Sequence, residues 1–244
     1  MSSKKAYLKE MGIDVWVERN PVHQDIRQDY SEVTPNIPAP PQIELESNNK
    51  PEVIPKANIE TLDWQALCKH VAECQLCELS KTRSKILFSS GNQNTSLMII
   101  GNAPTEEDEQ KGEFFSGQAG KLLTAMLKAM GYQRNDVYIS DILKCKTLEN
   151  KEPSDTQAES CAAYLLREIS LLKPKLILAL GNSAAQQLLK TKSTMSRLRG
   201  QLHYIDGIIS PIIVSYHPTY LLAAPNEKRK AWDDLQLAMK ELKQ

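Results

Sequence analysis

The sequence predicts an α/β fold: a three-layer α/β/α sandwich around a mainly parallel, four-stranded central sheet, preceded by a disordered N-terminal extension. From about residue 61 onward, short apolar runs alternate with longer segments of helical periodicity. The apolar runs are short and apolar throughout, as expected for strands that are covered on both faces of a parallel sheet. By contrast, 7 of the 13 prolines fall in residues 1–60, where no helix or strand period is sustained.

The predicted strands are the four most apolar short segments of the body. They cover residues 97–100, 136–143, 175–181 and 212–218. Polar loops follow three of them, at residues 101–108, 140–146 and 216–222. Because parallel strands end at the same edge of the sheet, the functional site is expected where these loops meet.

The predicted helices show apolar faces, caps and stop signals. They cover residues 62–74, 116–132, 154–172, 183–190 and 231–242. Ser154 or Asp155 suits the start of the third helix, and Pro174 follows its end. Asn182 is the predicted cap of the fourth helix, and Gly131 is the predicted stop of the second.

Three regions follow from this pattern: a short protein-binding peptide at 1–20, a Pro-rich linker at 21–60, and the folded domain at 61–244. The peptide carries more large apolar side chains than an inert tail needs. It could dock on its own body or bind another protein.

Composition narrows the class of protein. Hydrophobic residues make up 41% and charged residues 25%, as in ordinary globular proteins. No apolar run approaches the roughly 18 residues of a membrane span, and no signal peptide is recognisable, so the cytoplasm is the expected location. Residues 1–60 carry 7 Lys or Arg and 10 Asp or Glu, whereas the rest carries 23 and 20. The mildly basic body permits binding to nucleic acid.

Four of the five cysteines form a spaced set: Cys74, Cys77, Cys145 and Cys161. The first two form a C-x2-C turn, which aims two thiolates at one metal centre. The second pair, Cys145 and Cys161, is itself widely spaced, which favours an iron–sulfur cluster, but zinc or plain burial stays open on spacing alone. Cys68, six residues before the turn, is predicted to be a small buried residue.

The body resembles the iron–sulfur, family-four uracil-DNA glycosylases from about Cys74 to Leu235. The matching motifs are C-x2-C-x-L (74–79), G-x-A-P (101–104), FFSGQAGKLL (114–123), DVYISDILKC (136–145), PKLILALG (174–181), LRG (198–200), YHPTYLL (216–222) and WDDL (232–235). The resemblance implies that Cys74, Cys77, Cys145 and Cys161 ligate a [4Fe-4S] cluster and that the ligand of the protein is single- or double-stranded DNA.

The resemblance also implies roles at the pocket. His217 matches the histidine beside the uracil carbonyl oxygen, and Phe115 matches the phenylalanine on which the base stacks. The implied catalytic residues are Asn102, Asp108 and His217. The implied substrate-binding residues are Ala103, Phe115, Asp141 and His217.

Two positions depart from the family pattern. Asn102 stands where the family has a glutamate, and an amide can orient a water but cannot accept its proton. Asp141 stands where the family has a base-reading asparagine, so only a protonated Asp141 would restore a hydrogen-bond donor. Thr105 also replaces a glycine, and Asp108 is a candidate substitute acid. These changes predict reduced, redirected or absent excision of uracil.

Residues 6–21, AYLKEMGIDVWVERNP, carry a second, shorter resemblance, to the N-terminus of the psi subunit of bacterial DNA polymerase III. The resemblance implies contacts with the chi subunit. The contact residues would be Leu8, Met11, Ile13, Trp16 and Arg19. The sequence therefore predicts two alternative functions. The first is a glycosylase that excises uracil or another deaminated base. The second is a catalytically degenerate glycosylase fold that acts as a psi-like adaptor of the clamp loader.

Overall fold

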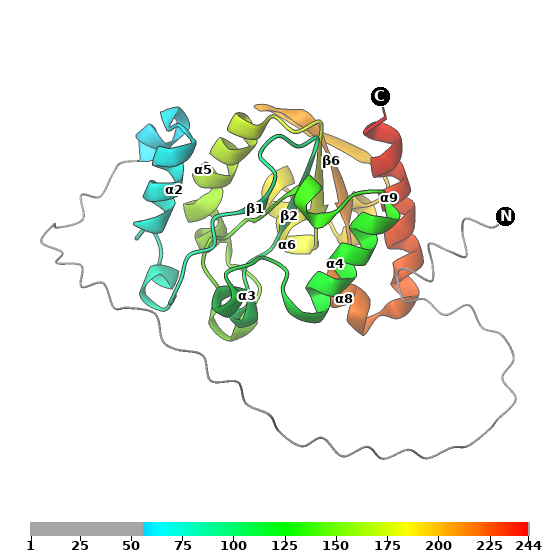
Figure 1. Ribbon diagram of the computed structural model, residues 1–244, viewed down its shortest axis with the longest axis horizontal. Coiled ribbons are helices and arrows are strands. Elements are labelled where there is room, and N and C mark those ends of the chain that lie inside the picture. The colour runs from blue at the N-terminus through cyan, green and yellow to red at the C-terminus, as the bar shows by residue number, and fades with distance from the viewer. Residues whose placement is uncertain (1–55, 244) are drawn as a thin grey trace, which may run out of the picture.

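The computed structural model describes residues 56–243, and the predicted N-terminal peptide and nearly all of the linker lie outside them. The chain forms a six-stranded sheet with the order β1-β3-β2-β4-β6-β5. The strands are β1 Ser90–Gly91, β2 Leu97–Gly101, β3 Tyr138–Asp141, β4 Leu176–Leu180, β5 Leu202–Ile205 and β6 Ile208–Ser215. Helices cover both faces of the sheet (Figure 1), so the predicted three-layer α/β/α class is confirmed.

The helical elements agree with the predicted ones and add several short turns. The α-helices are α2 Trp64–Ala72, α3 Glu106–Lys111, α4 Gly117–Ala129, α5 Asp155–Leu172, α6 Asn182–Leu189, α7 Met195–Leu198, α8 Pro218–Ala223 and α9 Lys228–Glu241. The 3-10 helices are η1 Lys56–Thr61, η2 Glu78–Lys81, η3 Arg134–Asp136, η4 Leu148–Asn150 and η5 Pro225–Glu227. In the described part of the chain, no helix combines the length and the apolar character that crossing a bilayer requires.

The four predicted strands are the parallel centre of the sheet, β3-β2-β4-β6. The prediction of four strands was too low, because β1 and β5 add antiparallel edges. Neither has the apolar run that marks a buried strand: β1 has two residues, and β5 is only partly buried. Asn182 was also misassigned as a cap. Gly181 is the N-cap, with φ +102°, and the helix begins at Asn182.

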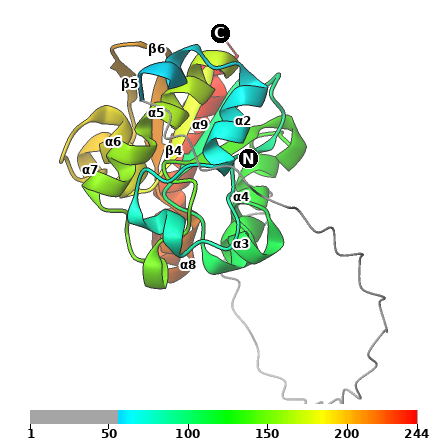
Figure 2. The same ribbon diagram turned by 90° about the vertical axis from the view of Figure 1, so that its left-hand side faces the viewer.

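Two apolar layers hold the sandwich together. Helices α4, α8 and α9 pack on one face of the sheet, and α5, α6 and α7 pack on the other. Helix α2 lies outside α5, where Leu67 and Val71 meet the buried Tyr164 (Figure 2). The alternation of side chains along each buried strand supplies both layers at once, which is why these strands are apolar throughout.

Candidate functional site

Four strand ends meet at one edge of the sheet, where the predicted site residues lie. Gly101 at the end of β2 is in register with Asp141 at the end of β3. Leu180 at the end of β4 is in register with Ser215 at the end of β6. Asn102 and His217 follow directly, as expected for the carboxyl edge of a parallel sheet.

Gly101 and Gly181 show how closely the site residues approach. A Cβ atom added at Gly101 would lie 2.3 Å from Asp141 Oδ1 and 2.5 Å from Phe115 Cζ. A Cβ atom added at Gly181 would lie 3.0 Å from Asn102 Oδ1 and 3.2 Å from His217 Cβ. Both glycines are therefore packing requirements of the site.

Phe115 and His217 form an aromatic pair. Their ring centroids are 5.2 Å apart and the rings are inclined by 29°. Phe115 has φ +50°, a left-handed conformation that is rare for a bulky residue and clusters at functional sites. The Arg134 guanidinium donates to the carbonyl oxygens of Phe114 and Phe115 and pairs with Glu113 at 2.8 Å, which holds this backbone in place.

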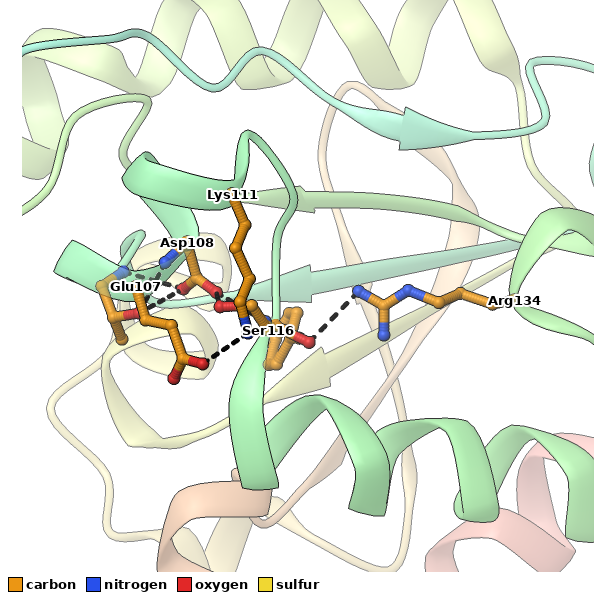
Figure 3. Close-up of polar contacts among 7 residues, drawn as sticks. Glu107, Asp108, Lys111, Ser116 and Arg134 are labelled. Carbon is orange, nitrogen blue, oxygen red and sulfur yellow. Dashed lines mark hydrogen bonds and ion pairs between the residues drawn. The ribbon is translucent and has the colours of Figure 1, made fainter. Parts of the chain in front are cut away.

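Asp108 fixes the other side of the same loop (Figure 3). Its Oδ2 accepts from the backbone N–H and the hydroxyl of Thr105, at 2.8 and 2.7 Å. Its Oδ1 accepts from the backbone N–H and the hydroxyl of Ser116, at 2.5 and 2.6 Å. Thr105 has an ordinary φ of −84° and caps α3, so the exchange of the family's glycine is accommodated. Both oxygens of Asp108 are engaged, and the side chain ties α3 to the start of α4.

Asn102 is held by both ends of its amide. Its Oδ1 accepts from the backbone N–H of Ala184 at 3.0 Å, in the first turn of α6. Its Nδ2 donates to Glu152 Oε2 at 3.3 Å. Glu152 carries no motif signal and lies in a loop between β3 and α5, so the sequence gives no reason to select it. Ala103 is half-buried and packs against the core layer under α5.

His217 is a neutral imidazole, and its single ring proton can be assigned to one of the two nitrogens. Its Nδ1 accepts from the backbone N–H of Thr219 at 3.2 Å, which places the ring proton on Nε2. Burial lowers the pKa of His217 to about 4, and the negative charge of Asp108 opposes this shift only in part. A neutral imidazole can donate to a developing anion without carrying charge itself.

We expect His217 to remain neutral at pH 5.5 in the folded chain, where an ordinary histidine is mostly protonated. Ring ¹⁵N shifts measured from pH 7 to 4 test this, with the urea-unfolded chain as reference. Because the unfolded ring protonates near pH 6.5, His217 lowers the free energy of unfolding as pH falls from about 6.5 to about 4. Protonation of the folded ring near pH 6.5 would contradict the assignment.

Asp141 is a buried carboxyl whose Oδ1 has no hydrogen-bond partner among residues 56–243. Burial raises the pKa of Asp141 well above its usual range, and the charge of Asp108 adds to the shift. The Lys144 ammonium and a backbone contact from Gly101 oppose it. The protonated form is therefore favoured, and it offers one donor and one acceptor, as an amide does.

Arg83 joins two of the segments that carry the four predicted cysteine ligands. Arg83 donates to Cys145 Sγ at 3.2 Å and to the Cys74 carbonyl oxygen at 2.7 Å. Burial raises the pKa of Cys145, and it raises that of Cys161 to about 12. The charge of Cys77 raises both pKa values further.

The described part of the chain contains no group of three His, Cys, Asp or Glu side chains close enough to hold a single metal ion. In a [4Fe-4S] cluster each cysteine ligates a separate iron, so its sulfur ligands stand farther apart than the ligands of a single metal ion. Cys68 is half-buried on α2, less buried than predicted, and burial raises the pKa of its thiol.

Comparisons with known proteins agree with this geometry. Residues 88–236 match the family model of the uracil DNA glycosylase superfamily. The chain is 33% identical over 184 residues to a type-4 uracil-DNA glycosylase of Archaeoglobus fulgidus, covering 73% of this chain and 92% of that enzyme. It is 31% identical over 182 residues to the type-4 enzyme of Pyrobaculum aerophilum, covering 72% and 93%. A DNA polymerase of Bacillus phage SP01 is 28% identical over 161 residues, which are 65% of this chain and 17% of the polymerase. The chain therefore belongs to the uracil-DNA glycosylase superfamily and is similar to its type-4 enzymes.

Proposed function

We propose that the chain is a DNA glycosylase that hydrolyses the N-glycosidic bond of uracil in DNA, with Asp141 reading the base as a neutral carboxylic acid. The carrying observation is the buried Asp141 Oδ1, without a partner among the described residues, beside the stacked pair of Phe115 and His217. A buried polar atom without a partner is costly, so a ligand that pairs with it is stabilised at this position. Glycosylases flip the target base out of the stack and read its edge in such a pocket.

Each side chain has a part in that chemistry. Uracil stacks on Phe115, accepts a hydrogen bond at O4 from the Asp141 hydroxyl, and donates its N3–H to the Asp141 carbonyl oxygen. As the bond from C1′ to N1 breaks, uracil leaves as an anion, and His217 Nε2–H stabilises the charge. Asn102 lies beside His217 across Gly181, where its amide can orient the attacking water.

Release of free uracil from a single-stranded oligonucleotide with one uracil tests the proposal. We expect time-dependent release by the wild-type chain, and a panel with hypoxanthine and xanthine tests whether the neutral acid broadens base choice. A sample treated with a competing uracil-free oligonucleotide serves as the control. No release by wild type, together with release by the double variant Asn102→Glu/Asp141→Asn, would show that this site has lost its activity.

The four cysteines Cys74, Cys77, Cys145 and Cys161 hold a [4Fe-4S] cluster in this proposal. The donor set fits, because thiolates are the usual ligands of such clusters and all four cysteines are free thiols, with Cys145 and Cys161 buried. When bound, the cluster ties together segments that are far apart in the sequence, and we assign it a structural role.

Arg83→Met is expected to yield a chain that loses iron faster in air than wild type. The guanidinium donates to a ligand sulfur and to the backbone of the C-x2-C turn, so its loss loosens two ligand segments at once. Iron and sulfide content and the decay of the cluster's visible absorbance measure the effect. Arg167→Met, which removes a guanidinium that donates to the Leu62 carbonyl oxygen, is the control. Equal iron loss in wild type and both variants would contradict the role of Arg83.

A second role at the replication machinery is favoured by the match to a phage DNA polymerase and by the psi-like residues near the N-terminus. In this role Leu8, Met11, Ile13, Trp16 and Arg19 bind the chi subunit. A peptide of residues 1–25 should then bind purified chi, and Trp16→Ala should weaken binding by at least ~2 kcal/mol, as for an interface hot spot. Calorimetry with a scrambled peptide as control measures this. Absence of binding would exclude the adaptor role.

A further inference from the structure

We propose that Glu152 is a further catalytic residue, which supplies the carboxylate that Asn102 cannot supply. The inference rests on the proposed glycosylase function and deepens it. Hydrolysis of an N-glycosidic bond is helped by a carboxylate that accepts a proton from the attacking water. Position 102 holds an amide, and Asp108 has both oxygens engaged by Thr105 and Ser116. The carboxylate must therefore come from another element.

The orientation of Asn102 points to Glu152. The backbone N–H of Ala184 occupies Asn102 Oδ1, which leaves the amide nitrogen as the donor end of the side chain. That nitrogen donates to Glu152 Oε2 at 3.3 Å. Asn102 is thus a positioning residue that binds the carboxylate, and its second N–H remains for a water molecule.

Glu152 has one oxygen anchored and one open. The Ser183 hydroxyl also donates to Oε2, so two donors from different elements hold that atom. Oε1 has no hydrogen-bond partner among residues 56–243, and the side chain is exposed. The carboxylate therefore keeps a free acceptor for a water while its position is fixed.

The contacts of Glu152 suit a carboxylate that acts as an acceptor. Both of its donors, the Asn102 amide and the Ser183 hydroxyl, bind the carboxylate as acceptor. Ser183 lies in the first turn of α6, where the helix dipole stabilises negative charge. An ionised carboxylate can take a proton, as the step requires.

The step balances as a simple displacement at C1′. A water bound between Glu152 Oε1 and Asn102 Nδ2 forms the new O–C1′ bond and gives one proton to the carboxylate. The C1′–N1 bond breaks, and its electron pair leaves with uracil, which accepts a hydrogen bond from His217 Nε2–H. The proton on Glu152 passes to solvent, to which the side chain is open, and no other reactant is needed.

Single-turnover release of uracil by Glu152→Gln tests the assignment in the full-length, cluster-containing chain. We expect a rate about 10²-fold below wild type, the lower end of what a general base contributes. The wild-type rate should rise with pH through one carboxyl titration, and Glu152→Gln should lack that rise. The matched control is Glu149→Gln, which removes the same charge from the same loop, where Glu149 pairs with the exposed Lys151 at 2.7 Å. Its rate should equal that of wild type.

A rescue variant separates chemistry from a structural role. Asn102→Glu/Glu152→Gln returns a carboxylate to the site at position 102, the hydrogen-bond partner of position 152. We expect this variant to regain both the rate of uracil release and the rise of that rate with pH. Glu152→Asp, with a shorter carboxylate, should fall between wild type and Glu152→Gln, and it serves in place of Glu152→Gln if that variant does not fold.

The outcomes are distinct. If Glu152→Gln releases uracil at the wild-type rate and with the wild-type rise with pH, the role of Glu152 is overturned and the proposed function stands. Loss of rate in Glu152→Gln without rescue by the double variant would assign Glu152 to structure and overturn its catalytic role. Absence of uracil release in wild type and Glu149→Gln would overturn the proposed function itself, and this inference with it.

Discussion

Replacement of His217 by alanine is expected to lower the single-turnover rate of uracil release about 10²–10³-fold, the usual cost of removing a donor to a developing anion. The ring is a neutral donor that is fixed in place, with Nδ1 bound to the Thr219 N–H. The effect should fall on the chemical step, and affinity for the DNA strand should change little.

A second substitution at position 217 separates donation from helix capping. His217 also caps α8, so alanine removes two interactions. His217→Asn keeps a side-chain acceptor that can cap α8. Its side chain is too short to place an N–H donor at the position of His217 Nε2–H. We expect it to retain the thermal stability of wild type and to lose the rate as alanine does. A His217→Asn variant with the wild-type rate would refute the role of the ring as donor.

Lys144→Met is expected to destabilise the fold by about 3–5 kcal/mol, as when one partner of a buried ion pair is removed. Lys144 and Glu168 are 2% and 0% exposed, and Nζ lies 2.5 Å from Glu168 Oε1. The Glu168 carboxylate also accepts from the hydroxyls of Tyr138 and Ser140, at 2.9 Å each. Without the lysine this carboxylate is buried with no opposing charge. The urea midpoint, followed by circular dichroism on cluster-containing protein, measures the loss.

Two further variants set limits on the size of the destabilisation caused by Lys144→Met. Lys144→Met/Glu168→Gln removes both charges but keeps an acceptor for the two hydroxyls, so most of the stability should return. Lys151→Met breaks an exposed pair with Glu149 and should cost at most about 1 kcal/mol. Equal loss in Lys144→Met and Lys151→Met would show that the buried pair contributes no more than a surface pair.

The strands and helices of the body could be predicted because burial imposes a period on the sequence. The run at 176–180 is apolar throughout because it lies between two helical layers, and Ser154 was a predicted cap because its side chain satisfies an N–H at the start of α5. Edge strands cannot be predicted from the burial pattern in this way. Strand β5 is partly exposed, and it pairs through its backbone, whose hydrogen bonds leave no compositional signal.

The residues of the candidate site could be predicted where they belong to a sequence motif. They could not be predicted where only the tertiary fold brings two residues into contact. Asn102, Phe115, Asp141 and His217 are brought together as their motifs imply. Glu152 and Arg83 depend on tertiary contacts across 50 and 62 residues, with Asn102 and Cys145. The raised pKa of Asp141 likewise results from burial that no local pattern encodes.

The left-handed backbone of Phe115 affects the thermodynamics of DNA binding. Such a conformation costs on the order of 1–3 kcal/mol, and the contacts from Arg134 offset it in the free protein. The aromatic surface is therefore complete before DNA arrives, and binding need not order this loop. We expect the loss of conformational entropy on association to come mainly from the DNA strand, with the backbone order parameters of residues 113–117 unchanged between free and bound protein.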